Sequence, residues 1–478
     1  MEFITKVSIE GKTPLVYGAF NENIDIHPNL NDYLNDLKND GLLDLSLGAV
    51  NKIYPFDKLE NKALFIIGLG DKNNYDYEKL EKAGSKITKK LNKELIVVLD
   101  SFCHNLNKEE VLKKLILTTL SYNYHYDETK SKKTQDDFSL GFYFTENLHH
   151  VIEEYVNLGM AINNTRDLIN KPYNYLNTND LVNYAQELVN TLKNDSVEIE
   201  VLNKEKIEKL GMNAFLGVNK GSSIDARLIH LKYYGDKENA EKISIVGKGL
   251  MFDTGGYSLK QKMNTMKSDM GGAATALGIF EACVNNNVKV NLEVIICATD
   301  NRISQDALLP DDVVTAMNKK TIEIVSTDAE GRLTLADAIT YAQRKGSKKI
   351  IDIATLTGAV IVALGEYTTG IFGNDQEMID KICNIGSKEN EHLWQLPITD
   401  YIREKVRSSK VADLTNSTGR SMGASGAAAF LEEFVEEGTK WVHLDIAGTC
   451  FRSQPAYNEA YGASGVMVKT LYEYLKSM

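Results

Sequence analysis

The chain has 478 residues, with 54 basic against 66 acidic side chains and a formal net charge of −12. The length favours two domains over one, and the acidic balance argues against non-specific nucleic-acid binding. Five widely spaced cysteines without a CxxC pair argue against a disulfide framework or a zinc ribbon. No apolar run approaches the ~18 residues of a membrane span, and the first residues lack a signal-peptide pattern, so we expect a soluble, cytoplasmic protein with no membrane partner.

The first third of the chain predicts a smaller α/β domain, residues 1–145. Short apolar runs typical of buried strands alternate with polar stretches of helical periodicity. We expect strands at residues 13–18, 63–68 and 94–99 and helices at residues 76–91 and 108–122. A long helix over residues 146–170 then links this domain to the rest of the chain, and Pro172 marks its end.

Residues 171–478 predict a larger domain with a mixed central sheet flanked by helices. Its apolar strands are expected at residues 197–202, 227–233, 242–246, 290–298, 348–354 and 441–446. Its helices are expected at residues 204–210, 272–285, 427–437 and 465–476. This alternation of strands and helices is typical of an α/β fold.

The stretch from Ser326 to Ala338 holds two carboxylates two residues apart, followed by a glycine and an arginine. It lies between a predicted strand, residues 321–325, and a predicted helix, residues 336–344. On an extended backbone Asp328 and Glu330 would point the same way, and two converging oxygen ligands suit a divalent cation. Acidic pairs of this kind are also common in charged turns, so the motif alone leaves both interpretations open.

Two glycine-rich segments upstream add further charged residues. Residues 246–260 contain two lysines and Asp253, and residues 268–274 contain Asp269. Burying so many carboxylates without compensation would be costly, and two divalent metals ~3.5–4 Å apart would compensate them and could share a bridging hydroxide. No histidine lies in these segments and there is no HExxH motif, so the oxygen-rich set by itself favours Mg²⁺ or Mn²⁺.

Together these segments resemble the leucyl aminopeptidase family of two-metal exopeptidases. The stretches YSLK at 257–260 and MKSD at 266–269 are most similar to its peptidase B branch, and the resemblance extends from about residue 166 to the C-terminus. It implies a metal-dependent aminopeptidase that hydrolyses the N-terminal residue of peptides, preferentially Leu or another apolar residue, through a two-metal bridged hydroxide. It also implies that the metals are zinc or manganese, with cobalt as a further candidate.

The resemblance assigns the metal ligands residue by residue. By match to the family motif they are Lys248, Asp253, Asp269, Asp328 and Glu330, with Asp253 and Glu330 bridging the two ions. Coordination by Lys248 would require a neutral amine, and two neighbouring dications could lower its pKa far enough.

Lys260 and Arg332 match the two catalytic positions of the family. A charged Lys260 would polarise the scissile carbonyl and stabilise the gem-diolate. Arg332 would hold a bicarbonate that relays the proton from the nucleophilic water. From the residues alone, Arg332 could equally form a salt bridge with Asp328 or Asp337, and the resemblance favours catalysis.

The expected side-chain pocket consists of small or apolar residues, which suit Leu, Met and similar side chains. By motif the pocket maps onto Met266, Thr355, Gly358 and Ala463, while Leu356 would offer its backbone carbonyl to the substrate.

Three departures from the family pattern are visible. Thr254 replaces a serine, Ser326 replaces an asparagine, and the segment from Lys260 to Asp269 is two residues shorter than usual. The metal ligand Asp269 keeps its context, so we expect the chemistry to be retained. Met266 lies in the shortened segment, so the departure concerns the shape of the pocket, on which the preference among side chains depends.

The resemblance also implies peptide substrates and a homohexamer with active sites facing an inner cavity, in which the N-terminal domain serves assembly or regulation. One alternative is a two-metal phosphoesterase, which the lack of histidine ligands and of a phosphate loop disfavours. Another is an assembly or DNA-binding protein on an aminopeptidase scaffold, for which the charge of −12 gives no support.

Overall fold

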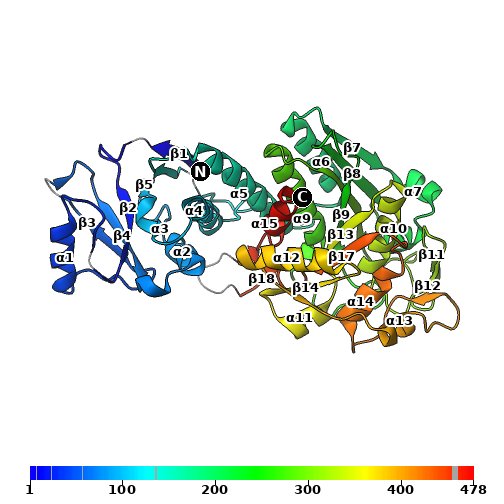
Figure 1. Ribbon diagram of the computed structural model, residues 1–478. Helices are drawn as coiled ribbons and strands as arrows, with labels where there is room; N and C mark the ends of the chain where they lie inside the picture. The colour runs from blue at the N-terminus through cyan, green and yellow to red at the C-terminus, as the bar shows by residue number, and fades with distance from the viewer. Residues whose placement is uncertain (7, 23, 56–57, 135–136, 455–460) are drawn as a thin grey trace. The chain divides into compact units, whose positions relative to one another are not determined.

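The computed structural model describes all residues except 7, 23, 56–57, 135–136 and 455–460. It divides into a first unit, Met1–Asn163, and a second unit that starts at Asn164 and includes the C-terminal helix. The division falls inside helix α5 (His149–Asn170), the helix that the sequence predicts as a link. In Figure 1 the first unit is coloured mostly blue to cyan and the second runs from green to red.

The first unit contains a six-stranded sheet with the order β1-β6-β5-β2-β4-β3, in which neighbours are parallel except β3 and β4. Its strands are β1 (Glu2–Lys6), β2 (Leu15–Phe20), β3 (Val50–Ile53), β4 (Leu64–Gly70), β5 (Glu94–Val98) and β6 (Ser139–Tyr143). Its helices are α1 (Asn31–Asn39), η2 (Lys72–Asn74), α2 (Tyr77–Gly84), α3 (Asp100–Cys103) and α4 (Lys108–Asn123). The predicted strands correspond to β2, β4 and β5, whereas β1, β3 and β6 were not predicted.

Helix α2 ends earlier than the sequence predicts, at Gly84 instead of residue 91. The Ser85 hydroxyl donates to the Lys82 carbonyl over 2.7 Å, a local bond that competes with the helical pattern. The next residues form turns, and the Asn123 side chain accepts from the Lys89 amide at 3.1 Å. The segment after α2 is therefore bound by a side chain that lies far away in the sequence.

The second unit contains an eight-stranded sheet with the order β15-β14-β17-β13-β9-β10-β8-β7. Its strands are β7 (Val197–Leu202), β8 (Arg227–Tyr234), β9 (Ile243–Asp253), β10 (Asn291–Asn301), β13 (Lys349–Ala354), β14 (Thr368–Gly373), β15 (His392–Gln395) and β17 (Lys440–Asp445). The four central strands β17, β13, β9 and β10 are parallel, while β8 and β14 run antiparallel to their central neighbours. The predicted mixed sheet flanked by helices is confirmed.

Helices cover both faces of this sheet. The larger ones are α6 (Thr178–Leu192), α9 (Gly271–Asn285), α10 (Gly331–Arg344), α12 (Gln376–Lys388), α14 (Gly423–Glu432) and α15 (Val468–Lys476). The shorter ones are α7 (Lys204–Leu210), α8 (Asn213–Asn219), η3 (Met266–Met270), α11 (Gly358–Leu364) and α13 (Asp400–Val406). Helix α10 packs with α8 and α14 on one face, and α9 packs with α6 and α15 on the other.

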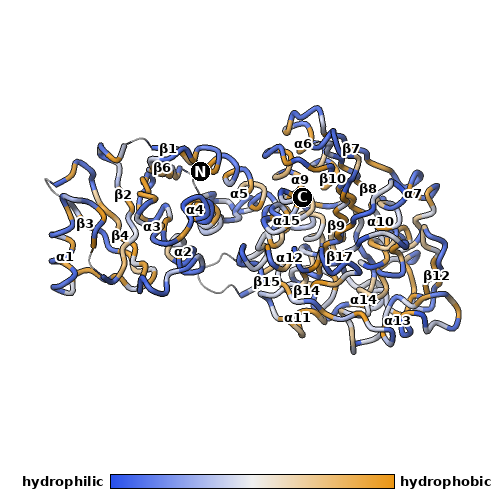
Figure 2. The backbone as a smooth tube through the Cα atoms, viewed as in Figure 1, coloured by the Kyte–Doolittle hydropathy of each residue, from blue (hydrophilic) through white to orange (hydrophobic). Residues whose placement is uncertain are grey.

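Strand β9 separates these two layers. Val246 and Leu250 belong to the apolar core that includes α10, whereas Gly247 faces Ala273 of α9, as the alternation of a strand requires. Strand β9 is almost entirely buried, and Figure 2 shows it as a hydrophobic segment inside the unit.

Two small sheets lie outside the main one. The first joins β11 (Val313–Thr315), β12 (Thr321–Glu323) and β16 (Leu414–Thr415), and the second joins β18 (Phe451–Arg452) and β19 (Gly462–Ala463). Within the described part of the chain, none of the helices combines the length and the apolar character that a membrane crossing requires.

Candidate active site

The predicted site residues gather at the edge of the sheet where the four parallel strands end. Strand β9 ends at Asp253 and β10 at Asn301, while Thr355 follows β13 and Asp445 ends β17. Because these strands are parallel, their carboxyl ends meet at one edge. Open α/β sheets bind their ligands at this edge.

A bulge in β9 brings Asp253 toward the end of β10. Leu250 pairs with Thr299, but Asp253 pairs with Asn301, so β9 holds one residue more than β10 between these points. A bulge bends its strand and re-aims the side chains that follow it. Asp253 therefore faces Asn301, whose side-chain amide donates to Asp253 Oδ1 over 2.8 Å.

The turn after β9 depends on two glycines. Gly255 and Gly256 have φ values of 85° and 60°, a region that strongly favours glycine. The turn folds back so that the Lys260 amide donates to the Thr254 carbonyl at 3.0 Å. This return places the Lys260 side chain among the carboxylates.

Asp328 and Glu330 lie on a turn and at the start of helix α10, not on an extended strand. Glu330 has φ −78° and ψ −36°, which are helical values. The extended geometry considered from the sequence is therefore wrong, because α10 begins at Gly331, directly after Glu330 and earlier than the predicted residue 336, and Asp328 lies in the turn before it. The carboxylates converge nevertheless: one oxygen each of Asp253, Asp328 and Glu330 lie within 4.8 Å of one another.

Lys248 lies buried between two further carboxylate contacts. Its Nζ is 2.8 Å from Asp269 Oδ1 and 3.1 Å from Glu330 Oε1, and it donates to the Thr355 carbonyl at 2.9 Å. Burial lowers the pKa of Lys248, but the charges of Asp269 and Glu330 outweigh burial and raise it above its usual range. The two carboxylates thus favour the protonated form of Lys248.

Lys260 pairs with the other two carboxylates. Its Nζ is 2.7 Å from Asp253 Oδ2 and 2.5 Å from Asp328 Oδ1. Burial again lowers the pKa of Lys260, and the nearby carboxylates, Asp253 first, raise it above its usual range overall. Its side chain is 22% exposed, so it lies at the border between the buried carboxylates and solvent.

The buried carboxylates have spare acceptor capacity. Asp269 Oδ2 and Glu330 Oε2 are buried and, among the described residues, have no hydrogen-bond partner. Burial raises the pKa of Asp269 to about 6, and burial followed by the charge of Asp253 raises that of Glu330 to about 8. Unpartnered buried acceptors are costly, and a divalent cation would satisfy them. The residues therefore fit a metal centre.

Arg332 is buried beside this cluster in the first turn of α10. Its Nη1 donates to the Asn416 carbonyl at 2.8 Å, while its Nε is a buried donor with no partner among the described residues. Burial lowers the pKa of Arg332 to about 10. Asp337, one salt-bridge partner that the sequence allowed, instead accepts from the amides of Phe215 and Met317.

Three of the predicted substrate-contact residues line the region next to Asp269. The Thr355 hydroxyl donates to Asp269 Oδ1 at 2.8 Å, and Met266 begins the short helix η3 that carries Asp269. The Leu356 amide donates to Asp445 Oδ1 at 3.1 Å. The loop after β13 is thereby fixed close to the carboxylates.

The remaining two predicted pocket residues differ in setting. Gly358 starts α11 with open space where a Cβ would lie. Ala463 is buried in β19, and its backbone binds Asn170 and Arg166 near the end of α5. Cys450, which was not predicted, lies beside the start of α9, because its Sγ fills the place where a Cβ on Gly271 would be. Gly271 follows Asp269 by two residues.

Several residues at this edge escaped the sequence-based prediction. Asn301 and Asp445 each end an apolar strand with a polar side chain, a signal that could have marked both. Asp445 accepts from the amides of Leu356, Thr357 and Ala447 and from the Thr357 hydroxyl. Asn416 has no comparable local signal, since strand pairing alone brings it to Arg332.

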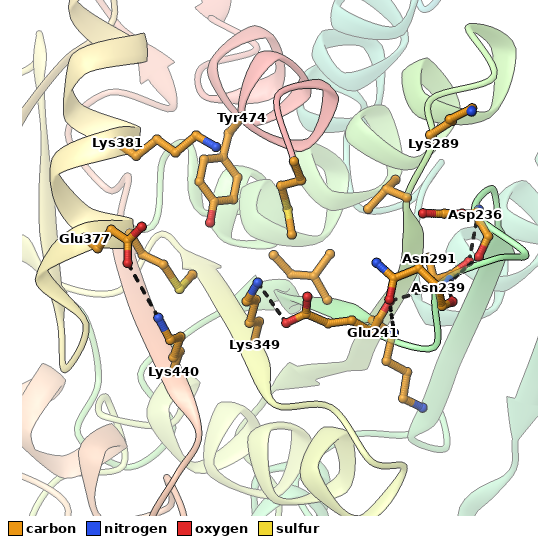
Figure 3. A pocket seen from close by; sticks show the side chains of 15 residues that line it. Asp236, Asn239, Glu241, Lys289, Asn291, Lys349, Glu377, Lys381, Lys440 and Tyr474 are labelled. Atoms are coloured by element: carbon orange, nitrogen blue, oxygen red, sulfur yellow. Dashed lines mark hydrogen bonds and ion pairs between the residues drawn. The ribbon is translucent and has the colours of Figure 1, made fainter.

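A cavity of about 210 Å³ lies at the opposite edge of the sheet, where the parallel strands begin. Figure 3 shows Lys349 and Lys440 facing carboxylates: Lys349 Nζ is 2.8 Å from Glu241, and Lys440 Nζ is 3.9 Å from Glu377. None of the predicted site residues lines this cavity. The residues that the sequence predicts for metal binding and catalysis lie at the carboxyl edge instead.

Comparisons with known proteins match both units. A family model described as the catalytic domain of the cytosol aminopeptidase family matches residues 163–472, and the model of that family's N-terminal domain matches residues 16–133. A probable cytosol aminopeptidase of Bacillus subtilis (strain 168) is 39% identical over 476 residues, covering 96% of this chain and 94% of that protein. The probable cytosol aminopeptidase of Bacillus licheniformis is 38% identical, covering 94% and 92%.

Solved structures with the same fold match this chain over nearly its whole length. The bottromycin maturation enzyme BotP is 26% identical with a TM-score of 0.87, covering 98% of this chain and 99% of that chain. The same enzyme in complex with Mn gives the same values.

Proposed function

The chain belongs to the cytosol aminopeptidase family, and on this premise we propose that it removes single N-terminal residues from peptides with two divalent cations, preferring Leu and other apolar side chains. It is a metal-dependent hydrolase of the leucyl aminopeptidase type. The observation that carries the finer proposal is the convergence of Asp253, Asp328 and Glu330, whose oxygens lie within 4.8 Å of one another.

The residues that would hold the metals are Lys248, Asp253, Asp269, Asp328 and Glu330. The unpartnered oxygens of Asp269 and Glu330 support this set. Two bound ions would supply Lewis acidity and an activated water for amide hydrolysis. Lys248 could be a ligand only as a neutral amine, and nearby dications favour loss of its proton.

Zinc, manganese and cobalt all suit such a site. The structure of BotP with Mn supports manganese as one candidate, and carboxylate oxygens are ligands that manganese accepts readily.

Lys260 would act through its charge. Its raised pKa keeps the amine protonated at neutral pH, and it lies at the partly exposed border of the carboxylate cluster. A fixed ammonium here would stabilise the negative charge that develops on the carbonyl oxygen of the cleaved bond.

Arg332 would bind a bicarbonate ion. Its buried Nε has no partner among the described residues, and a bicarbonate oxygen could accept from it. The bound anion would receive the proton of the attacking water and so replace a side-chain base.

The proposed substrate preference rests on the charge of the carboxylate cluster and on the size of the pocket residues. The α-amino group of a peptide is a cation, and the carboxylate cluster attracts it, which explains cleavage at the N-terminus. Met266, Thr355, Gly358 and Ala463 would surround the side chain of the first residue, with Leu356 offering its carbonyl. Cys450 joins this set because its Sγ and the methyl group of Thr355 both lie beside Gly271.

Assembly and location remain proposals. We expect a homohexamer. In this proposal an N-terminal domain, residues 1–145, serves assembly or regulation, residues 146–170 form the linking helix, and residues 171–478 form the catalytic domain. The name of the Bacillus relatives supports a cytosolic location. The phosphoesterase alternative is disfavoured, since the family matches are to peptidases.

The deciding experiment compares Leu-anilide with N-acetyl-Leu-anilide. We expect cleavage of the first only, because the acetyl group removes the cationic amine that the carboxylates bind. Treatment with a chelator should abolish this activity, and Mn²⁺, Zn²⁺ or Co²⁺ should restore it. Equal rates on both substrates would refute exopeptidase action, and full activity in protein shown by elemental analysis to be metal-free would refute the metal centre.

A further inference from the structure

Asn301 binds both segments that carry the converging carboxylates. Its side-chain amide donates to Asp253 Oδ1 at 2.8 Å and to the Thr327 carbonyl at 3.0 Å. The backbone carbonyl of Asn301 accepts from the backbone amide and the hydroxyl of Thr254 at 3.1 and 2.8 Å. With 5% of its surface exposed, Asn301 is a buried neutral crosslink between the end of β9 and the turn before α10.

Thr327 makes a second set of bonds between the same two segments. Its hydroxyl donates to the Gly255 carbonyl at 2.6 Å and accepts from the Ser258 amide at 2.7 Å. Its amide in turn donates to the Ser258 hydroxyl at 3.1 Å. The pair Thr327 and Ser258 is thus bonded in both directions, and Thr327 is 2% exposed.

These bonds orient Asp253 as well as hold it. Oδ1 of Asp253 accepts from the Asn301 amide and from the Gly255 backbone amide at 2.8 Å. Its other oxygen, Oδ2, then faces Lys260, which also contacts Asp328. The orientation of one carboxylate toward the other is therefore fixed by neutral donors.

The neutral crosslinks differ from the lysine contacts in one respect. Lys260 binds the carboxylate oxygens that a cation would also bind, so a cation and Lys260 would compete for them. The hydrogen bonds of Thr327 are made with backbone atoms and with the Ser258 hydroxyl, and the side-chain amide of Asn301 donates to the backbone carbonyl of Thr327. None of these bonds uses a carboxylate oxygen. These bonds can persist with a cation in place.

We propose that Asn301 and Thr327 are positioning residues that set the spacing between Asp253 and Asp328, and through it the metal affinity and the hydrolysis rate. This inference rests on the proposed metal centre. Partners behind metal ligands commonly contribute about 10–100-fold in metal affinity, which gives the expected size of the effect.

The first test measures Mn²⁺ binding by calorimetry on chelator-treated full-length protein, together with kcat and KM on Leu-anilide. Asn301→Ala should bind Mn²⁺ about 10–100-fold more weakly, with kcat lowered more than KM is changed. Asn301→Asp should be worse, because it places a carboxylate against Asp253. The matched control is Asn219→Ala: Asn219 is 3% exposed and its amide also makes two bonds, to the Ile224 carbonyl and the Thr299 hydroxyl.

The second test uses a conservative pair at the other position. Thr327→Ser keeps the hydroxyl and should keep Mn²⁺ affinity, whereas Thr327→Val removes it and should weaken binding at least about tenfold. Thr340→Val is the control for a buried threonine elsewhere, since Thr340 bonds only within α10 among the described residues. If Asn301→Ala fails to fold, the Thr327 pair decides the question.

The proposal is overturned if Asn301→Ala binds Mn²⁺ as tightly as Asn219→Ala, or if Thr327→Val and Thr327→Ser bind it equally. Asp328→Ala serves as the reference for the proposed function. If Asp328→Ala binds as much Mn²⁺ as the unaltered protein, the metal centre itself is wrong. If only Asp328→Ala loses metal, the metal centre stands and the positioning role fails.

Discussion

At the scale of single residues, the charged side chains of the site differ in how deeply they are buried. Asp253, Asp269 and Glu330 are buried, and Lys248 and Lys260 each pair with two carboxylates. The two lysines differ in exposure, 3% for Lys248 against 22% for Lys260. The deeper lysine lies where a ligand would be, and the other lies where a substrate could reach it, so their roles should be separable.

Substitution should separate the two lysines. Lys260→Ala should leave metal content nearly intact and lower kcat by about 10²–10³, since it removes a charge that acts in the transition state. Lys248→Ala should weaken one metal site, and excess metal should recover part of the activity. Lys248→Arg should not rescue it, because a guanidinium cannot become neutral to donate a lone pair.

Metal stoichiometry measured beside steady-state kinetics checks this prediction. Lys260→Arg, which keeps the charge on a longer planar group, should restore activity in part. A Lys248→Arg variant that binds two metals and turns over normally would contradict the ligand role. Loss of metal in Lys260→Ala would mean that the two roles are exchanged or merged.

Glu281 on α9 predicts a pH dependence of stability that is independent of the metal centre. It is 8% exposed, and burial raises its pKa from 4.5 to about 7. The folded state therefore holds this proton more tightly than the unfolded chain. The contribution of protonated Glu281 to the free energy of unfolding is therefore fully present below pH 4.5 and is lost as the pH rises through about 7.

Replacing Glu281 with Gln should remove this dependence. The stability of Glu281→Gln relative to the unaltered protein should increase by about 3 kcal/mol between pH 4.5 and pH 8, as measured by urea unfolding. Glu187→Gln, at an exposed position on α6, is the matched control and should show no such trend. A difference that does not change with pH would refute the prediction.

At the scale of elements, the site depends on close approach between backbones. Gly272 at the start of α9 lies where a Cβ would come within 1.9 Å of the Ile353 carbonyl, and a Cβ on Gly331 at the start of α10 would lie 2.3 Å from Lys248 Cε. Glycine at both helix starts lets α9 and α10 approach β9 from its two faces. The carboxylates that precede each helix are thereby brought together.

Gly331→Ala should therefore damage the site more than the fold. An added Cβ would displace Lys248 from Asp269 and Glu330, and a misplacement of about 1 Å can cost on the order of 10²-fold in rate. Within a helix, alanine is otherwise favoured over glycine, so the melting temperature should change little. The measurement is kcat together with the melting temperature.

Gly217→Ala is the control for this prediction. Gly217 lies in α8, and its Cβ would meet nothing closer than 3.3 Å, a methyl of Val314. This variant should keep full activity. Equal loss of activity in both variants would point to a general effect of helix packing, against the role given to Gly331.

At the scale of the whole molecule, the proposed site residues all belong to one of the two units. The catalytic residues proposed here all lie in the second unit, on its eight-stranded sheet and the loops at the carboxyl edge. The first unit has its own sheet and its own apolar core, and it contributes none of the proposed site residues. An assembly role for the first unit is therefore part of our proposal.

The assembly prediction concerns mass in solution. We expect a hexamer with six times the 53.3 kDa mass of the chain, measured by light scattering on active protein. A closed ring or a pair of rings would be the symmetric solution for such an oligomer. An active species with the mass of one chain would contradict this prediction.

The sequence by itself determined the elements whose signals are local. Helix α7 has the predicted limits, because Asn203 caps its start, accepting from the Lys206 amide at 3.2 Å, and Gly211 ends it with φ 75°. The apolar runs likewise predicted the central strands, since burial on both faces requires them. The glycine-rich acidic segments resemble those of the leucyl aminopeptidase family, and this resemblance implied a metal-dependent aminopeptidase before any geometry was known.

Only the tertiary structure decided how the site is assembled. The sequence placed Asp328 and Glu330 on an extended backbone, whereas the fold places them at a helix start, beside Asp253. Asn416 was not predicted because no local pattern marks it and its partner Arg332 lies far away in sequence. The polar end of an apolar strand could have marked Asn301, but only the fold shows that its partners are Asp253 and Thr327. The physical reason is that capping and periodicity act over a few residues. Parallel strand pairing, in contrast, brings together the ends of strands that are far apart in the sequence and that no local signal connects.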